Sequence, residues 1–376
     1  MTTEGFSWPA PQAMDAIHIW STLFVVVKFL VCFLGTLFNG LLIFTICKNL
    51  HRLTTPSYLI LSIAVSDFLS CSVAVPFSIS GYFEKEWPFG MAGCEAHAFM
   101  IFLLGLVSIT HLTAISVEKY LTITRSISRD SYFDKKQVLL VIFATWVYSF
   151  GFSVAPLLGW SRYGLEGIND TCSIVWESSL PGDNAYFGIM FFACFFFPMA
   201  IITFCYYKIH KVSKNVVDNT FQMGGYARTM TQALLKKHRK SAIYFSSVIA
   251  AYLLAWSPYA VVSLLTVLRV KTHPVASTAC GVFAKTSFLL NPVVYVIFSA
   301  KFRRLVIRSV PIFRRSRVVI SGALNIASQT SSALWKSPIV FHFVNLSILL
   351  WAKIYFLLSL LFLFVCFFLS NIQCNV

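Results

Sequence analysis

Lys285 is the residue of this sequence most clearly placed to do chemistry, because it lies inside the apolar run 274–298. At ~1.5 Å per helical residue it is about 16 Å from the outer end of that run, too deep for its side chain to reach water. Burial favours the neutral amine, which is a nucleophile toward carbonyl carbon. Lys285 is therefore suited to forming a Schiff base with an aldehyde, and a structural ion pair is the alternative. Lys28, in the outer third of the run 17–47, is expected instead to extend outward to water.

The elements that must position Lys285 are membrane helices. Of 376 residues, 57% are hydrophobic and only 12% charged, a composition suited to a bilayer. Each of seven apolar runs reaches the ~20 residues that a crossing helix needs, namely 17–47, 57–82, 93–117, 138–159, 186–208, 241–268 and 274–298. We predict an all-α membrane protein, a bundle of seven transmembrane helices followed by a short amphipathic cytoplasmic helix.

This prediction divides the chain into four parts. We expect an extracellular N-terminus at 1–16, the bundle with its amphipathic helix at 17–310, a cytoplasmic linker at 311–338 and a hydrophobic extension at 339–376. The extension has no assigned role. An eighth span, a hairpin lying in the membrane and an artefactual extension all remain open for it.

The formal net charge of +16 indicates topology. Lys and Arg collect in the connections after the first, third, fifth and seventh runs, and basic residues stay on the cytoplasmic side of short loops. The N-terminus is therefore expected outside the cell, with the chain integral to the plasma membrane and some basic residues contacting membrane lipid. A nucleic-acid partner is not expected, because no pattern of stacking aromatic residues accompanies the charges.

Only two of the ten cysteines, Cys94 and Cys172, lie on the outer side in this topology. That compartment is oxidising, so we predict that they form a disulfide. The same outer loop contains Asn169-Asp170-Thr171, an N-x-T sequon. Asn169 is therefore a possible glycosylation site.

Marker residues recur in the predicted spans. Asn291-Pro292-Val293-Val294-Tyr295 begins six residues after Lys285. In order along the chain, further markers are Asn39, Asp67, Trp146, Pro198, Tyr206, Trp256 and Pro258. With these residues the sequence resembles the rhodopsin-like G-protein-coupled receptors, and the lysine before the Asn-Pro-x-x-Tyr motif narrows the resemblance to opsins. The stretch 255–262 is more similar to non-visual, neuropsin-like or invertebrate opsins than to vertebrate visual pigments. The overall resemblance is to non-visual neuropsin-like or peropsin-like opsins.

The resemblance implies a light-sensing receptor that holds retinal, 11-cis or all-trans, as a Schiff base on Lys285 and activates a heterotrimeric G protein on photoisomerisation. Arrestin is a further candidate partner. Gly105, Trp256 and Tyr259 are expected to line the retinal pocket. A diffusible-ligand receptor is one alternative function. A transporter is disfavoured, because the sequence shows no inverted repeat.

A protonated Schiff base in an apolar pocket needs a nearby anion. Vertebrate visual pigments place a glutamate three residues after the cysteine of the third span, where this chain has His97. Glu166, six residues after Trp160, occupies the outer-loop position that serves as counterion in many other opsins, and we predict that role for it. Two alternatives stay open: Glu166 binds loop backbone, or the Schiff base is unprotonated and absorbs in the ultraviolet.

The expected coupling end departs from the family. The Asp/Glu-Arg-Tyr triplet is here Glu118-Lys119-Tyr120, and lysine lacks the planar fork of arginine. Lys119 cannot form an attractive pair with His238, which replaces the acidic residue of visual pigments. An opsin-type photoisomerase with little signalling is therefore the second alternative, and no other enzymatic activity is expected. The coupling residues are expected to be Glu118, Lys119, Tyr120, Tyr206, Asn291, Pro292 and Tyr295, with Asn39 and Asp67 in a polar network between spans and with no catalytic or metal-binding residues.

Overall fold

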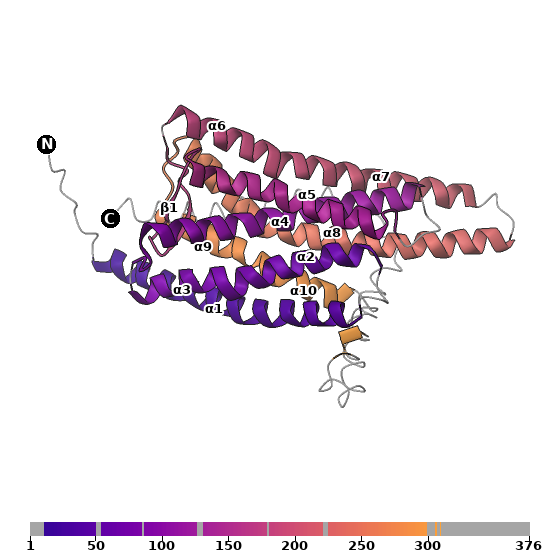
Figure 1. Cartoon of the computed structure of the whole chain (residues 1–376), viewed down its shortest axis with the longest axis horizontal. Coiled ribbons are helices and arrows are strands. Elements are labelled where there is room, and N and C mark those ends of the chain that lie inside the picture. The colour runs from indigo at the N-terminus through magenta and orange to yellow at the C-terminus, as the bar shows by residue number, and fades with distance from the viewer. Residues whose placement is uncertain are drawn as a thin grey trace.

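The computed structural model describes residues 11–49, 54–84, 86–125, 131–178, 180–220 and 225–298, with 305, 306 and 309. Long helices lie side by side in a bundle (Figure 1). Their bounds are α1 Pro11–Lys48, α2 Pro56–Leu69, α3 Val75–Glu84, α4 Gly90–Arg125, α5 Lys135–Val154, α6 Pro181–Met190, α7 Phe197–Thr220, α8 Gly225–Val267, α9 Pro274–Lys285 and α10 Ser287–Phe298. Short segments with other helical geometry, η2 Ser70–Ala74, η3 Ala155–Leu158 and η4 Phe191–Phe196, join or extend them.

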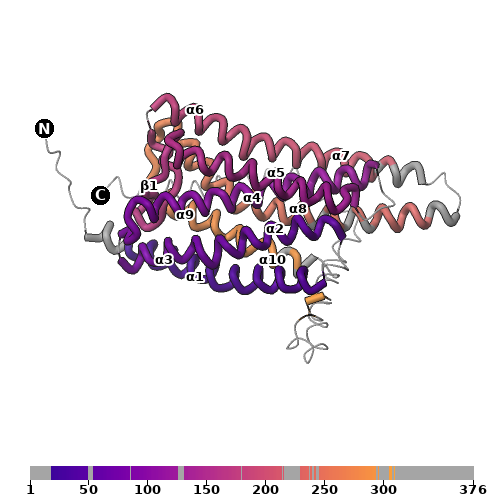
Figure 2. Tube along the Cα trace, viewed as in Figure 1, coloured from indigo at the N-terminus to yellow at the C-terminus, as the bar shows by residue number. Residues whose placement is uncertain are grey.

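The expected bundle of long apolar helices is confirmed in the part of the chain that the structure describes. Six described helical segments are long and apolar enough to cross a membrane: His18–Lys48, Pro56–Glu84, Gly90–Arg125, Lys135–Leu158, Pro181–Ser213 and Phe245–Val267. The run 274–298, expected to make the seventh crossing, forms two helices of 12 residues, α9 and α10, which meet at Thr286. Figure 2 shows α10 beside α1, so the first and last crossings pack together.

Several helices exceed the bounds expected from hydropathy. The first begins at Pro11, inside the segment assigned to the N-terminus, and α8 begins at Gly225 rather than at 241. Helical hydrogen bonds close locally, so a helix continues into polar residues after the apolar run has ended. The expected amphipathic helix lies largely outside the described residues, and the linker at 311–338 and the extension at 339–376 lie wholly outside them.

Local sequence sets several helix starts. Asp134 precedes α5 and makes a reciprocal capping box with Gln137, with each side chain accepting from the other's backbone N–H. Proline stands in the first turn of α2, α6 and α9, where its missing N–H has no helical partner to lose. These signals determine where the helices α2, α5, α6 and α9 begin.

The described part of the outer loop between α5 and α6 contains a two-stranded antiparallel hairpin, β1 Tyr163–Glu166 and β2 Thr171–Ile174. In its register Leu165 faces Cys172 and Glu166 faces Thr171. The hairpin lies across one end of the bundle, beside α4 and α9 (Figure 1). It therefore places loop side chains against the ends of the helices.

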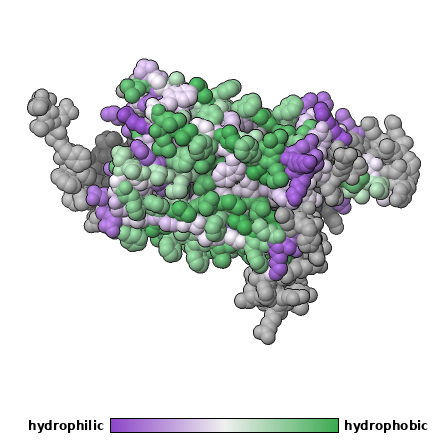
Figure 3. All heavy atoms as spheres, viewed as in Figure 1, coloured by the Kyte–Doolittle hydropathy of each residue, from purple (hydrophilic) through white to green (hydrophobic). Residues whose placement is uncertain are grey.

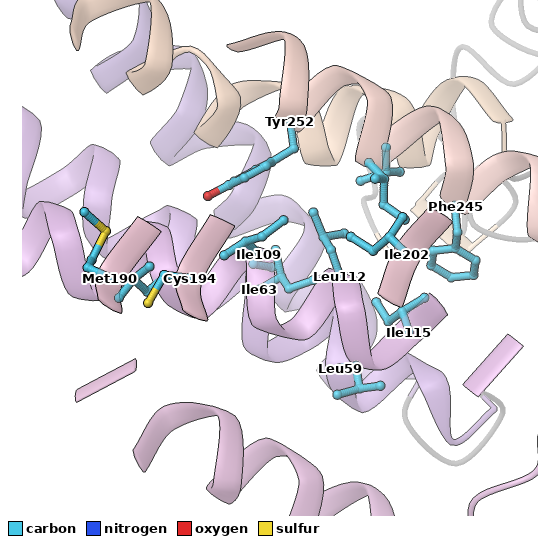
Figure 4. Close-up of a cluster of buried hydrophobic side chains, with 14 of the residues drawn as sticks. Leu59, Ile63, Ile109, Leu112, Ile115, Met190, Cys194, Ile202, Phe245 and Tyr252 are labelled. Atoms are coloured by element: carbon cyan, nitrogen blue, oxygen red, sulfur yellow. The ribbon is translucent and has the colours of Figure 1, made fainter. Parts of the chain in front are cut away.

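Apolar side chains occupy both the interior and the membrane-facing surface. In Figure 4 Ile109 and Leu112 of α4 lie among side chains from the neighbouring helices α2, α7 and α8, including Ile63, Ile202 and Tyr252. In Figure 3 hydrophobic residues cover the middle of the visible face and hydrophilic residues gather toward its two ends. This distribution is what a bilayer requires of a helical bundle.

Candidate functional site

A cavity lies below the outer hairpin, between α4, η4, α8 and α9. It contains about 1020 Å³ of empty space, counting the space at its opening. Much of its wall is aromatic, with Phe102, Trp176, Phe191, Phe195, Tyr252, Trp256 and Tyr259 among the lining residues. Glu166 and Lys285 also line this cavity, so it suits an extended apolar molecule with a reactive group at one end.

Lys285 is the last residue of α9 and is 5% exposed. Its Nζ donates to Thr171 Oγ1 of β2 at 3.4 Å. Among the described residues Lys285 forms no salt bridge. The amine thus has one neutral protein partner and an apolar cavity in front of it, which leaves it available for a carbonyl compound.

Glu166, at the end of β1, faces the cavity from the loop side. A Cβ built on Gly281 of α9 would lie 3.7 Å from its Oε2, and the hydroxyls of Tyr259 and Ser173 are its hydrogen-bond partners. Burial raises the pKa of Glu166 above its ordinary value, while the Lys285 ammonium and the two hydroxyls oppose that rise. Glu166 is therefore the carboxyl group that shares the cavity with Lys285.

His97 of α4 is fully buried next to the same threonine. Its Nε2 lies 3.1 Å from Thr171 Oγ1. Lys285 Nζ donates to the same oxygen, so one threonine hydroxyl contacts both His97 Nε2 and Lys285 Nζ. The structure thus joins His97 and Lys285 through Thr171 and gives His97 no anionic role.

The expectation that Lys28 extends outward to water is wrong. The residue is 1% exposed, and its Nζ lies 2.6 Å from Asp170 Oδ2 and donates to the Ser78 carbonyl at 3.1 Å. The outer loop folds down between the helices and brings Asp170 to the lysine. An internal anion thereby replaces the contact with water that a snorkelling side chain would make.

Trp256 and Gly105 lie in direct contact in the wall of the cavity. A Cβ built on Gly105 would lie 2.9 Å from the indole ring, so the glycine lets that ring lie against α4 rather than simply widening the cavity. Trp256 Nε1 donates to Ser287 Oγ of α10 at 2.9 Å. Tyr259 accepts from Trp176 Nε1 at 3.3 Å. The expected pocket residues Gly105, Trp256 and Tyr259 are therefore brought together in one wall.

The predicted disulfide between Cys94 and Cys172 is confirmed, with a Cα–Cα distance of 5.4 Å. It ties β2 to the outer end of α4. The residues on either side of Cys172 are Thr171, which contacts Lys285, and Ser173, which contacts Glu166. The covalent link therefore holds the loop contacts of the site in place.

Polar residues form a network deeper in the bundle. Asn291 of α10 donates to Asp67 Oδ2 at 2.7 Å, and Ser108 of α4 donates to Asp67 Oδ1 at 3.1 Å. Asn39 donates to the carbonyl of Phe288 at 2.9 Å. Pro292 is buried directly after Asn291 in α10. This network connects α1, α2, α4 and α10 on the side of the cavity away from the hairpin, which the distribution of basic residues predicts to be cytoplasmic.

At the cytoplasmic end Lys119 pairs with its own neighbour in sequence. Lys119 Nζ lies 2.9 Å from Glu118 Oε2 and 5.2 Å from the centre of the Phe245 ring of α8. Glu118 Oε1 accepts from Thr122 at 2.8 Å. The other expected coupling residues lie in α4, α7 and α10: Tyr120 packs on Phe204, and Tyr206 and Tyr295 are buried.

Asn169 lies exposed at the hairpin turn with a φ of 63°, while Thr171 of its sequon is 2% exposed. Glycosylation of Asn169 stays a prediction. Sequence reasoning missed Asp170, Thr171, Ser173 and Trp176 as site residues. A signal was present, because all of them lie within four residues of Cys172 and the predicted disulfide already placed this segment over the bundle.

The comparisons with known proteins agree with this geometry. The sequence profile of the family described as 7 transmembrane receptor (rhodopsin family) matches residues 38–295. The chain therefore belongs to the rhodopsin family of seven-transmembrane receptors. Melanopsins and squid rhodopsin, which are opsins, are among its relatives within that family.

Melanopsin-B of Xenopus laevis is 31% identical over 284 residues, which are 74% of this chain and 53% of that protein. Human melanopsin is 32% identical over 318 residues, 82% of this chain and 66% of that protein. The crystal structure of squid rhodopsin matches with a TM-score of 0.71 and 28% identity, over 80% of this chain and 87% of that one. The chain spans about half the length of the first curated relatives it matches. The narrower likeness to neuropsin-like or peropsin-like opsins stays a prediction.

Proposed function

We propose that this protein is a light-sensing receptor that binds retinal covalently at Lys285 and passes a light-driven change of shape to a heterotrimeric G protein. One observation carries the proposal. A buried amine with no acidic partner within salt-bridge distance among the described residues ends an aromatic cavity that also contains the carboxyl group of Glu166. Membership of the rhodopsin family and similarity to opsins support it.

The residues fit retinal, an aldehyde on a long apolar polyene. When bound, retinal supplies a group that absorbs light and changes length by isomerisation. Lys285 provides the amine for the covalent bond, and the aromatic wall excludes water from it. We propose 11-cis or all-trans retinal as the bound isomer.

Glu166 balances the positive charge on the Lys285 nitrogen. It is the acidic residue that lines the cavity, and Tyr259 and Ser173 hydrogen-bond its carboxylate. Thr171 holds the nitrogen from the loop side, and neutral His97 orients the threonine hydroxyl. An anion that lines the cavity without touching the nitrogen stabilises the protonated form less than a direct ion pair would. The nitrogen can then keep its proton in the resting state and still release it later.

Trp256 connects the cavity to the helices that move. Its ring lies against Gly105, its Nε1 binds Ser287 of α10, and Pro258 follows two residues later in α8. A proline within a helix removes a backbone hydrogen bond and allows a bend. Displacing the ring therefore acts on α8 and α10 together, and α8 carries Phe245, which faces Lys119 at the cytoplasmic end.

We place the receptor in the plasma membrane with its N-terminus outside, because basic residues collect on the other side of the bundle. The G protein then meets the end formed by Glu118, Lys119 and Tyr120, and arrestin is a further partner for the same end. Membrane lipid surrounds the apolar surface shown in Figure 3.

The test is reconstitution with 11-cis or all-trans retinal followed by borohydride reduction, which fixes an imine to the protein. The wild-type protein is expected to retain labelled retinal, and Lys285→Ala is expected to lose it completely. Lys271→Ala, at an exposed lysine of the outer side, is the matched control and should label normally. Wild-type protein without covalent label would overturn the proposal.

A photoisomerase is the second candidate, favoured by Lys119 in place of the family's arginine. The two functions separate in one preparation. A receptor accelerates nucleotide exchange on added G proteins in the light. An isomerase leaves exchange unchanged and releases isomerised retinal over many cycles.

A further inference from the structure

Lys28 and Asp170 form a buried ion pair beside the site, 142 residues apart in sequence. Their charged atoms are 2.6 Å apart, and the two side chains are 0% and 8% exposed. Neither residue belongs to the marker set of the sequence. A buried charge is unfavourable unless it is paired, so each of these two residues makes the other tolerable.

Three structural elements hold Asp170 in position. Lys28 binds it from α1, and the disulfide at Cys172 fixes the strand two residues later. On the third side the backbone of α3 lies against it, because a Cβ on Gly81 would come within 2.8 Å of the Asp170 carbonyl oxygen. The Asp170 Oδ1 atom is buried and has no hydrogen-bond partner among the described residues. Part of this carboxylate is therefore not committed to another protein group.

The pair lies close to Lys285, because Asp170 directly precedes Thr171, whose Oγ1 accepts from Lys285 Nζ at 3.4 Å. The charged groups that act on Lys285 are Lys28 from α1, Glu166 from β1 and Asp170 from the hairpin turn. The other polar groups around this cluster, His97 of α4, Thr171 of β2 and Tyr259 of α8, are neutral there. Because Lys28 cancels Asp170, Glu166 supplies the net negative charge of the site.

We propose that Lys28 neutralises Asp170 and thereby leaves Glu166 as the counterion of the retinal-bearing nitrogen. Asp170 is then a second, masked counterion. Removing the charge of Lys28 exposes it. This inference rests on the proposed attachment of retinal to Lys285.

The decisive experiment compares visible absorption spectra in a Glu166→Gln background. Glu166→Gln alone removes the net anion, so the visible band is expected to be lost to an ultraviolet band at neutral pH. Adding Lys28→Met releases Asp170, so the visible band should return. Adding Asp170→Asn to that double variant should abolish it again. Lys271→Met in place of Lys28→Met is the matched control and should leave the ultraviolet band unchanged.

The single variants test the same charge balance in the presence of Glu166. Asp170→Asn leaves an unpaired buried cation near the nitrogen, so the pH at which the visible band is lost should fall. Lys28→Met adds a free anion, so that pH should rise. Lys28→Arg keeps the charge and should preserve the wild-type transition.

Thermal unfolding of the apoprotein gives a readout that does not depend on retinal. Lys28→Met and Asp170→Asn should each lower the melting temperature, and the double variant should lose less than the sum of the two. If the losses in melting temperature are additive, or if Asp170→Asn shows no loss, the two residues do not form a stabilising buried pair and the inference is overturned.

The outcomes also separate the two proposals. Wild-type protein that takes no covalent retinal overturns both. Wild-type pigment with a Glu166→Gln, Lys28→Met variant that stays in the ultraviolet overturns this inference alone. A Glu166→Gln variant that keeps its visible band likewise overturns the inference, because another group would then already be the counterion.

Discussion

The outer and cytoplasmic ends of the bundle each contain a buried ion pair, but the two pairs are built differently. At the outer end Lys28 binds Asp170, which lies 142 residues away in a disulfide-anchored hairpin. At the cytoplasmic end Lys119 binds Glu118, its neighbour in the same helix. The outer pair joins separate elements, whereas the cytoplasmic pair stays within α4.

This difference matches the roles proposed for the two ends. Contacts across elements hold the hairpin over the cavity and keep the groups around Lys285 at fixed places. A pair within one helix survives when neighbouring helices move. The Lys119 contact to Phe245 of α8 is a cation–π contact, which is weaker than a buried ion pair and easier to exchange. If the protein acts as proposed, the outer contacts should therefore stay fixed and the cytoplasmic contacts should exchange during the change of shape.

The largest expected effect is at the outer pair. Asp170→Asn leaves the Lys28 ammonium buried without an anion, and removing one partner of a buried pair destabilises by about 3–5 kcal/mol. Glu118→Gln should cost less, since its pair joins no separate elements. Thermal unfolding in detergent compares the two variants. Equal losses would break the contrast between the ends.

Breaking the disulfide should rank next. Cys94→Ala with Cys172→Ala releases the hairpin from α4, and loss of a disulfide typically removes about 2–4 kcal/mol. The covalent yield of retinal on Lys285 should fall as well, because Thr171 and Glu166 lose their anchor. The yield and the melting temperature are measured together. A normal yield would show that the hairpin is held by its other contacts alone.

The next largest effect is expected from a substitution in the cavity wall. Gly105→Ala places a methyl group 2.9 Å from the Trp256 ring, and overpacking of this kind destabilises by about 1–3 kcal/mol. Gly151→Ala is the control: a Cβ there meets nothing within 4 Å, and alanine favours the helix. The pigment of Gly105→Ala should show a shifted absorption band, and that of Gly151→Ala an unchanged one.

A smaller effect is expected at the cytoplasmic end. Phe245→Leu removes the aromatic face from Lys119, worth about 0.5–2 kcal/mol, and should raise nucleotide exchange in the dark without moving the absorption band. Phe44→Leu, which removes an exposed ring beneath Lys48, is the matched control for losing a cation–π contact elsewhere. A shift of the absorption band in Phe245→Leu would contradict the separation of the two ends.

The smallest effect concerns the pH dependence of the apoprotein. The pKa of Glu166 is raised in the folded protein, so the fold holds this proton to a higher pH than the unfolded chain does. The stabilising contribution of the protonated form is complete below the ordinary carboxyl pKa of about 4.3 and is lost as pH rises through the raised value. Glu166→Gln mimics the protonated group, so the melting temperature of this variant should rise relative to that of the wild type between acidic and neutral pH. A difference that stays constant with pH would contradict this.

Much of the fold could be predicted from the sequence. The bilayer demands long apolar helices, which predicted seven crossings, and the basic residues predicted their direction. The topology then left Cys94 and Cys172 alone on the outer side, so their pairing followed without knowledge of the fold. Lys285 was conspicuous because a charge in mid-membrane is unfavourable unless it has a function.

The tertiary structure alone decided which groups surround that lysine. Lys28 was expected to reach water, because it lies in the outer third of its run; its partner comes instead from the hairpin. The register of β1 and β2 places Glu166 and Thr171 opposite each other, and the same register sets which side chains face the cavity. Contacts between residues so far apart in sequence depend on how the hairpin docks on the helices, and local preferences along the chain carry no record of that docking.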